Sequence, residues 1–180
     1  MVVRNLLVCV SVLLFAGNVC AAKPETGPVI KDFGPVFEVS EGSYNLDKGK
    51  HYKVSMDVSA TSESSGDLNR RLESAARFLN LHARNGINAN DIEFAIIVHG
   101  QAGKDLLKDD AYQARFEEPN PNTAMLNALG DAGVKIYLCG QTAAYRGFAA
   151  GELNPVVTMA LSAMTAHVQL QSQGFTLIPF

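Results

Sequence analysis

The sequence is poor in cysteine. It contains three cysteines, and two of them, Cys9 and Cys20, fall in an N-terminal segment that we expect to be removed. Cys139, the thiol that remains, cannot form a disulfide within its own chain. In an oxidising compartment a lone cysteine is buried and inert, paired between chains, or kept as a reactive group.

A hydrophobic run long enough to cross a membrane is also missing. The longest apolar stretch, residues 6–16, is much shorter than the ~20 residues that a membrane-spanning helix needs. It follows Arg4 and precedes the small residues Cys20, Ala21 and Ala22, which is the pattern of an export signal. We therefore predict a signal peptide over residues 1–22 and a periplasmic protein with no membrane anchor after cleavage, with secretion as the alternative.

Three further absences restrict the function. The chain carries 15 Lys and Arg against 18 Asp and Glu without a basic cluster, which argues against a nucleic-acid partner. The four histidines lack the short spacing of metal ligands, so we expect no metal site. The segment HGQAGKDL lacks the spacing of a phosphate-binding loop, and no Gly-x-Ser-x-Gly motif is present. We expect no cofactor.

Proline and glycine separate the chain into two parts. Residues 23–50 contain both repeatedly, which predicts an extended N-terminal arm with an edge strand over residues 36–39. Residues 51–180 form one domain with regular patterns. Their apolar spacing predicts strands at 51–59, 92–98, 134–138 and 175–180, helices at 67–85, 101–107, 123–132 and 141–146, a polar loop at 109–121, and a long helix from Asn154 to just before Gly174. This order predicts a three-layer α/β/α sandwich with a mostly parallel sheet.

The long helix expected after Asn154 is apolar over most of its circumference. Such a helix must be buried on more than one side, and one domain of this size offers little core to cover it. We expect a homo-oligomer with this helix at the interface. The alternative is a helix in the centre of a monomer.

The candidate site lies where two strands end. One predicted strand leads into His99, and another into Cys139, Gly140, Gln141 and Thr142. Because ligands bind beyond the carboxyl ends of parallel strands, both groups should lie on one rim. The N–H groups at the start of the next helix favour the thiolate of Cys139, and Thr142 can donate a hydrogen bond to the sulfur.

Arg146 lies two helical turns after the cysteine, and its side chain can lean back and add positive potential there. Each of these residues also has a structural interpretation. Cys139 is an inert core residue in that view, and Arg146 pairs with Glu152 or with a neighbouring subunit. His99 is either a general acid or base or only the polar end of a strand. His167 is one of the histidines that we expect to be structural.

At this point the sequence resembles a known family. GVKIYLCGQTAAYRG, followed by ELNPVVTMALSAMTAHVQLQSQGFTLI, is similar to the DsrE/DsrF-like family, and the resemblance covers roughly residues 51–180. It implies a three-layer α/β fold and oligomers, commonly trimers or hexamers. Cys139 matches the position at which sulfur-relay members carry a persulfide, and Ala143, Arg146 and Gly147 match the helix that follows.

Two hypotheses result. In the first, the protein is a periplasmic, sulfurtransferase-like persulfide carrier in which Cys139 accepts sulfur from a donor protein or compound and passes it to an acceptor. In the second, it is a non-enzymatic oligomeric module that binds a small ligand or a protein, and Cys139 is structural.

Overall fold

The computed structural model describes residues 22–39 and 46–179. The predicted signal peptide, apart from Ala22, lies outside these residues. None of the described helices is long and apolar enough to span a membrane.

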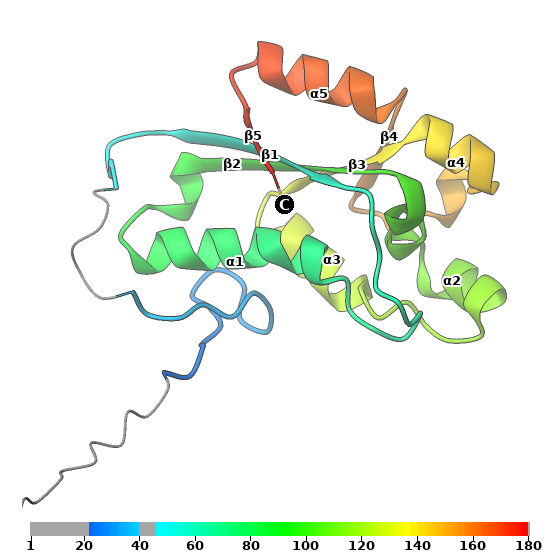
Figure 1. Ribbon diagram of the computed structural model, residues 1–180, viewed down its shortest axis with the longest axis horizontal. Helices are drawn as coiled ribbons and strands as arrows, with labels where there is room; N and C mark the ends of the chain where they lie inside the picture. The colour runs from blue at the N-terminus through cyan, green and yellow to red at the C-terminus, as the bar shows by residue number, and fades with distance from the viewer. Residues whose placement is uncertain (1–21, 40–45, 180) are drawn as a thin grey trace, which may run out of the picture.

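A five-stranded sheet forms the middle of the domain (Figure 1). Its strands have the spatial order β4-β3-β2-β1-β5, and every neighbouring pair is parallel. They are β1 (Tyr52–Val58), β2 (Ile92–Val98), β3 (Lys135–Cys139), β4 (Val157–Ala160) and β5 (Thr176–Ile178). Parallel pairing requires crossover connections, and the helices supply them.

Helices cover both faces of this sheet. α1 (Arg70–Arg84) and α3 (Thr123–Asp131) lie on one face, and α5 (Ala163–Ser172) lies on the other (Figure 1). The central strand β2 is apolar on both sides: Phe94 and Ile96 pack in the cluster with α1, whereas Ala95 and Ile97 pack in the cluster with α5. The predicted three-layer α/β/α sandwich is confirmed.

The remaining elements lie around the carboxyl edge of the sheet or connect the layers. They are α2 (Asp109–Phe116), α4 (Gly140–Arg146) and the short 3-10 helices η1 (Ala89–Asp91), η2 (Gly100–Leu106) and η3 (Ala150–Glu152). α4 starts directly where β3 ends, so the chain turns from strand to helix at Cys139.

The long helix predicted from Asn154 is wrong in its first part. Asn154 begins a turn, in which its side-chain oxygen accepts a hydrogen bond from the Val156 N–H at 3.1 Å. The β-branched residues that follow then form β4, which pairs with β3 from Ile136↔Val157 to Cys139↔Ala160. The helix, α5, begins only after Ser162, whose hydroxyl accepts a hydrogen bond from the Thr165 N–H.

The polar loop predicted over residues 109–121 is helical in its first half. Asp109 and Asp110 lie in the first turn of α2, where negative charge is favourable. Tyr112 and Phe116, one turn apart, pack with their ring centroids 4.6 Å apart, and Tyr112 is fully buried. Tertiary packing of these two rings outweighs the polar composition of the segment.

The N-terminal segment 22–39 packs on α1. The Asn80 side chain accepts hydrogen bonds from the Val29 and Ile30 N–H groups and donates to the carbonyls of Ile30, Phe33 and Gly34. Ile30 is buried in the main core. Instead of the edge strand expected over residues 36–39, the described part of this segment has an isolated bridge between Glu25 and Val36.

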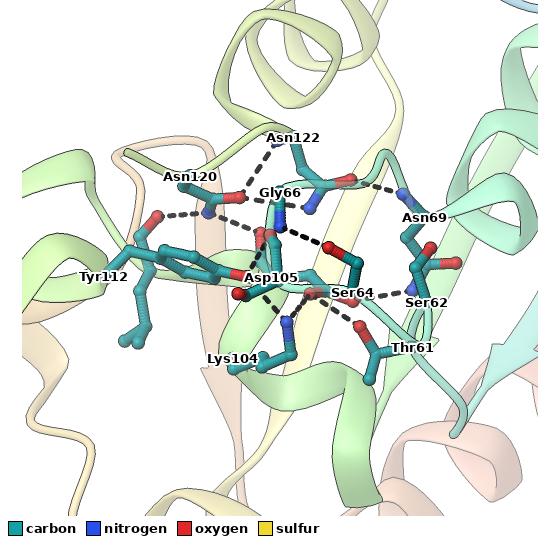
Figure 2. A network of polar contacts seen from close by, with 12 residues as sticks. Thr61, Ser62, Ser64, Gly66, Asn69, Lys104, Asp105, Tyr112, Asn120 and Asn122 are labelled. Atoms are coloured by element: carbon teal, nitrogen blue, oxygen red, sulfur yellow. Dashed lines mark hydrogen bonds and ion pairs between the residues drawn. The ribbon is translucent and has the colours of Figure 1, made fainter. Parts of the chain in front are cut away.

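A buried polar network fixes the loop between β1 and α1 (Figure 2). The Asp105 carboxylate accepts hydrogen bonds from the Asn69 amide at 2.7 Å and from the Thr61 hydroxyl at 2.9 Å. Burial raises the pKa of Asp105 despite these bonds and the nearby Lys104 ammonium. Asn69 also caps α1, because its side-chain oxygen accepts hydrogen bonds from the Arg71 and Leu72 N–H groups. This one side chain therefore joins the helix start to Asp105 in η2.

Candidate functional site

Three parallel strands end next to one another and bring their polar side chains to one pocket. Asp57 lies at the end of β1, His99 directly follows β2, and Cys139 ends β3. The register pairs Val58 with Val98 and Val98 with Leu138, so these strand ends are level. The pocket has a volume of about 330 Å³ and is lined by Asp57, His99, Cys139, Gln141, Thr142, Ser162, Ala163, Met164 and His167.

The structure thus places His99 and Cys139 on the same rim, as the strand pattern predicts. The Cys139 residue is only 6% exposed, yet it lines the pocket. Its thiol is therefore at the base of an open depression.

The starts of two helices surround the Cys139 sulfur with hydrogen-bond donors. Burial acts to raise the pKa of Cys139, but hydrogen bonds from the backbone N–H groups of Thr142, Ala163 and Gln141 outweigh it, and the pKa lies below its ordinary value. Gln141 and Thr142 belong to the first turn of α4, and Ala163 is the first residue of α5. The thiolate is the form that such a set of donors stabilises.

Thr142 contributes its side chain as well as its backbone. Its hydroxyl acts on the Cys139 thiol in the same direction as the backbone N–H groups and lowers the pKa further. The same oxygen accepts a hydrogen bond from the Gly100 N–H at 3.1 Å. This second contact orients the hydroxyl and connects the start of α4 to the loop after His99.

Gly140 allows the second helix to approach. A Cβ atom at this position would lie 2.6 Å from the Ala160 carbonyl oxygen and 3.1 Å from that of Leu161. The absence of a side chain therefore lets the segment between β4 and α5 pass close to the start of α4. This close passage brings the start of α5 to the pocket that Cys139 lines.

Asp57 is shared by two histidines. Its Oδ1 lies 2.7 Å from Nε2 of His167, and its Oδ2 lies 3.0 Å from Nε2 of His99. Burial acts to raise the pKa of Asp57, but the hydrogen bonds from His167 and His99 outweigh it, so the pKa is lowered. The carboxylate is therefore a strong acceptor between two ring N–H donors.

Arg146 does not line this pocket. It ends α4 with an exposed side chain, about 10 Å along the helix axis from the cysteine at 1.5 Å per residue. Glu152, the alternative partner considered for it, instead pairs with Arg115 at 2.9 Å. The groups that lower the pKa of Cys139 are the backbone N–H groups, which the sequence predicts at the start of α4, and the Thr142 hydroxyl; the additional effect expected from Arg146 is not among them.

Sequence reasoning missed Asp57, His167 and the Ala163 N–H. Asp57 could have been found by the rule that led to His99, because it also lies at the carboxyl end of a parallel strand. His167 was expected to be structural. Its position in the pocket depends on where α5 begins, and the predicted helix started nine residues too early relative to Ala163. Among residues 22–39 and 46–179, no group of three or more acidic, histidine or cysteine side chains has the arrangement of a metal site.

The sequence as a whole matches the model of the DsrE/DsrF-like family over residues 50–180. The chain belongs to this family. DsrE-like proteins are linked to sulfur relay, which agrees with a pocket built around one thiol. No curated protein matches the sequence.

Two solved structures share the DsrE-like fold with this chain. One is the YchN protein from E. coli, with a TM-score of 0.53 and 19% sequence identity. The other is MTH1491 from Methanobacterium thermoautotrophicum, described as a protein of unknown function, with a TM-score of 0.52 and 17% identity. Each comparison covers 72% of this chain and 99% of the other. At these identities the likeness establishes the fold.

Proposed function

We propose that this DsrE-like protein is a persulfide carrier and that Cys139 accepts and releases the sulfur. The observation that carries the proposal is the position of Cys139 in the pocket, where β3 ends between the first residues of α4 and α5, whose N–H groups lower the pKa of its thiol. A lowered thiol pKa raises the thiolate fraction of Cys139 at a given pH, and it also makes the same sulfur a better leaving group. A carrier needs both properties, one for loading and one for unloading.

The loading step is a displacement on sulfur. The Cys139 thiolate attacks the outer sulfur of a persulfide R–S–SH, and the bond between the two donor sulfurs breaks. The electron pair of that bond leaves with R–S⁻, and Cys139–S–SH is formed. For unloading, an acceptor thiolate attacks the outer sulfur of Cys139–S–SH and Cys139 leaves as the thiolate. No external oxidant or reductant is consumed.

Mass spectrometry of a single-thiol chain tests this function. Cys9→Ser and Cys20→Ser substitutions in the full chain leave Cys139 as the sole thiol. Incubation with glutathione persulfide should add about 32 Da, the mass of one sulfur atom, and an acceptor thiol such as dithiothreitol should remove it. Failure to gain this mass, or the same gain in a chain that also carries Cys139→Ala, would contradict the proposal.

The low exposure of Cys139 supports a second candidate, an oligomeric binding module in which the thiol is structural. This thiol would react with iodoacetamide far more slowly in the folded protein than in urea. A carrier thiol should react in the folded protein at a comparable or higher rate, because a larger thiolate fraction compensates for restricted access.

We further propose that the chain acts as a homo-oligomer, a trimer or hexamer, in the periplasm. Large apolar side chains are exposed around α5: Leu161 is 74%, Met164 76% and Val168 67% exposed. They lie beside β4, which is an edge strand of the sheet, and a cavity of about 350 Å³ lies between β4 and α5. Exposed apolar surface next to an unpaired edge strand is a common form of subunit interface.

A further inference from the structure

The Cys139 pocket contains four titratable side chains, and the carrier function described above uses one of them. The other three are Asp57 from β1, His99 after β2 and His167 from α5; α4 contributes Gln141 and Thr142, which do not titrate. The three are joined to one another through Asp57. These three side chains are therefore candidates for a role in the same sulfur-transfer reaction.

The helix α5 connects the part of the pocket around Cys139 with the part around Asp57. Ala163 and His167 are four residues apart and lie on the same side of the helix. Ala163 lines the pocket beside Cys139, and its N–H helps to lower the pKa of the thiol, whereas the His167 ring binds Asp57. The histidine pair is thus fixed relative to the thiol by one rigid element.

The hydrogen bonds determine which histidine can hold an extra proton. Both rings face Asp57 with Nε2, so each donates its Nε2–H to the carboxylate. Nδ1 of His167 is buried and has no hydrogen-bond partner in the described part of the chain. A second N–H there would find no acceptor. The His99 side chain is 34% exposed and lines the pocket, so a second N–H on His99 can meet solvent or a bound molecule.

We propose that His99 is the proton donor for the group that leaves when Cys139 is loaded with sulfur, and that Asp57 and His167 are positioning residues that hold it. The inference rests on the proposed carrier function. As the Cys139 thiolate attacks R–S–SH, the breaking S–S bond gives its electron pair to R–S, which takes a proton from the His99 imidazolium. The products are Cys139–S–SH, R–SH and neutral His99, which regains its proton from water.

Leaving-group chemistry explains why a donor is useful there. An alkyl thiolate is the anion of a weak acid with a pKa of about 8.5, so it departs slowly without a proton near neutral pH. The reverse departure, of Cys139 itself, needs no such help because the N–H donors at the helix starts stabilise its anion. The site therefore uses an acid for loading and the helix N–H groups for unloading.

Two uncharged disulfides, used in place of a persulfide, test whether His99 assists the leaving group. Cys139 in the single-thiol chain attacks 4,4′-dithiodipyridine, whose leaving group is stable without a proton, and 2-hydroxyethyl disulfide, whose alkyl leaving group is not. At pH 7, His99→Gln should slow the alkyl reaction by about tenfold or more and leave the aromatic reaction within about twofold. Asp57→Asn should do the same, and His167→Gln should have a smaller effect in the same direction.

A matched control completes the test. His51→Gln, which changes an exposed histidine paired with Glu93 outside the pocket, should leave both rates unchanged. Equal slowing of both disulfides, or no change in either, would overturn the proton-donor role. A chain that passes this test but gains no sulfur from a persulfide would instead refute the carrier function alone.

Discussion

Gly140 and Ala160 are in such close contact that a Cβ atom on the glycine would lie 2.6 Å from the alanine carbonyl oxygen. Real Cβ atoms do not approach a backbone oxygen so closely, and neither backbone can move freely because β3 and β4 are paired up to Cys139↔Ala160. The contact holds the start of α5 against the end of β3. The lowered pKa of the Cys139 thiol therefore depends on Gly140, a residue that has no side chain.

Gly140→Ala should destabilise the fold and weaken the thiolate together. We expect the free energy of unfolding to fall by about 1–3 kcal/mol, a typical cost of overpacking, and the Cys139 pKa to rise as the Ala163 N–H moves away. Urea unfolding and the pH dependence of iodoacetamide alkylation measure the two effects. Gly151→Ala is the control, since its Cβ would meet nothing within 4 Å. A normal alkylation profile in Gly140→Ala would contradict this account.

Thr142→Val should raise the Cys139 pKa with little change of shape. The substitution removes the hydroxyl that hydrogen-bonds the sulfur and also the acceptor of the Gly100 N–H. The midpoint of the alkylation rate against pH should therefore move upward, toward the value of about 8.5 of a free cysteine. Thr176→Val, on an exposed position of β5, is the matched control and should leave the midpoint in place. An unchanged midpoint in Thr142→Val would show that the backbone donors suffice.

The stability of the protein should rise with pH through the alkaline side of neutrality. The folded state lowers the Cys139 pKa, so between this pKa and about 8.5 the unfolded chain binds a proton that the folded chain has released. The contribution of this thiol to the free energy of unfolding therefore increases across the window and reaches its full value above it. It is lost as the pH falls through the folded-state pKa. Thermal unfolding of the single-thiol chain and of the chain with Cys139→Ser should diverge with increasing pH. Parallel curves would exclude a stabilised thiolate.

Asn69→Ala should be among the most destabilising single changes outside the pocket. The side chain caps α1 through the Arg71 N–H at 2.9 Å and donates to Asp105, so its loss leaves a buried carboxylate with one donor fewer. We expect a loss of about 2 kcal/mol or more in the free energy of unfolding, measured in urea. Asn90→Ala, at an exposed position, should change it by less than about 0.5 kcal/mol.

Val168→Glu should disrupt the proposed oligomer. The substitution places a charge in the middle of the exposed apolar face of α5, where a subunit contact would have to bury it. Light scattering should show a shift from a trimer or hexamer toward the monomer. Gln171→Glu introduces the same charge at another exposed position of α5 and should leave the mass unchanged. A monomeric unsubstituted protein would refute the oligomer directly.

The central sheet was predictable because its strands have strong local signals. Residues 92–98 are apolar except for Glu93, which is typical of a strand covered on both faces, and Cys139 and His99 then fall on one rim. β4 was not predictable in the same way. It is four residues long, only Leu161 and Ser162 separate it from α5, and only its pairing with β3 distinguishes it from the first turn of a helix.

The partners of each site residue were harder to predict than its place on the rim. His167 is 110 positions from Asp57 in the sequence, and their contact follows from the rotation of α5 over the sheet rather than from any local pattern. The direction of the Arg146 side chain could not be predicted for a related reason. A long side chain on a predicted helix can be given many directions, and only the packed structure shows that this one is exposed.

Cys139 is 6% exposed at the base of a pocket of about 330 Å³. For the carrier proposed above, a recessed thiol would favour donors that reach into the pocket, such as a low-molecular-weight persulfide or a narrow protein tail that ends in its reactive sulfur. A donor whose sulfur is flush with a broad surface would first meet Met164, which is exposed and lines the pocket.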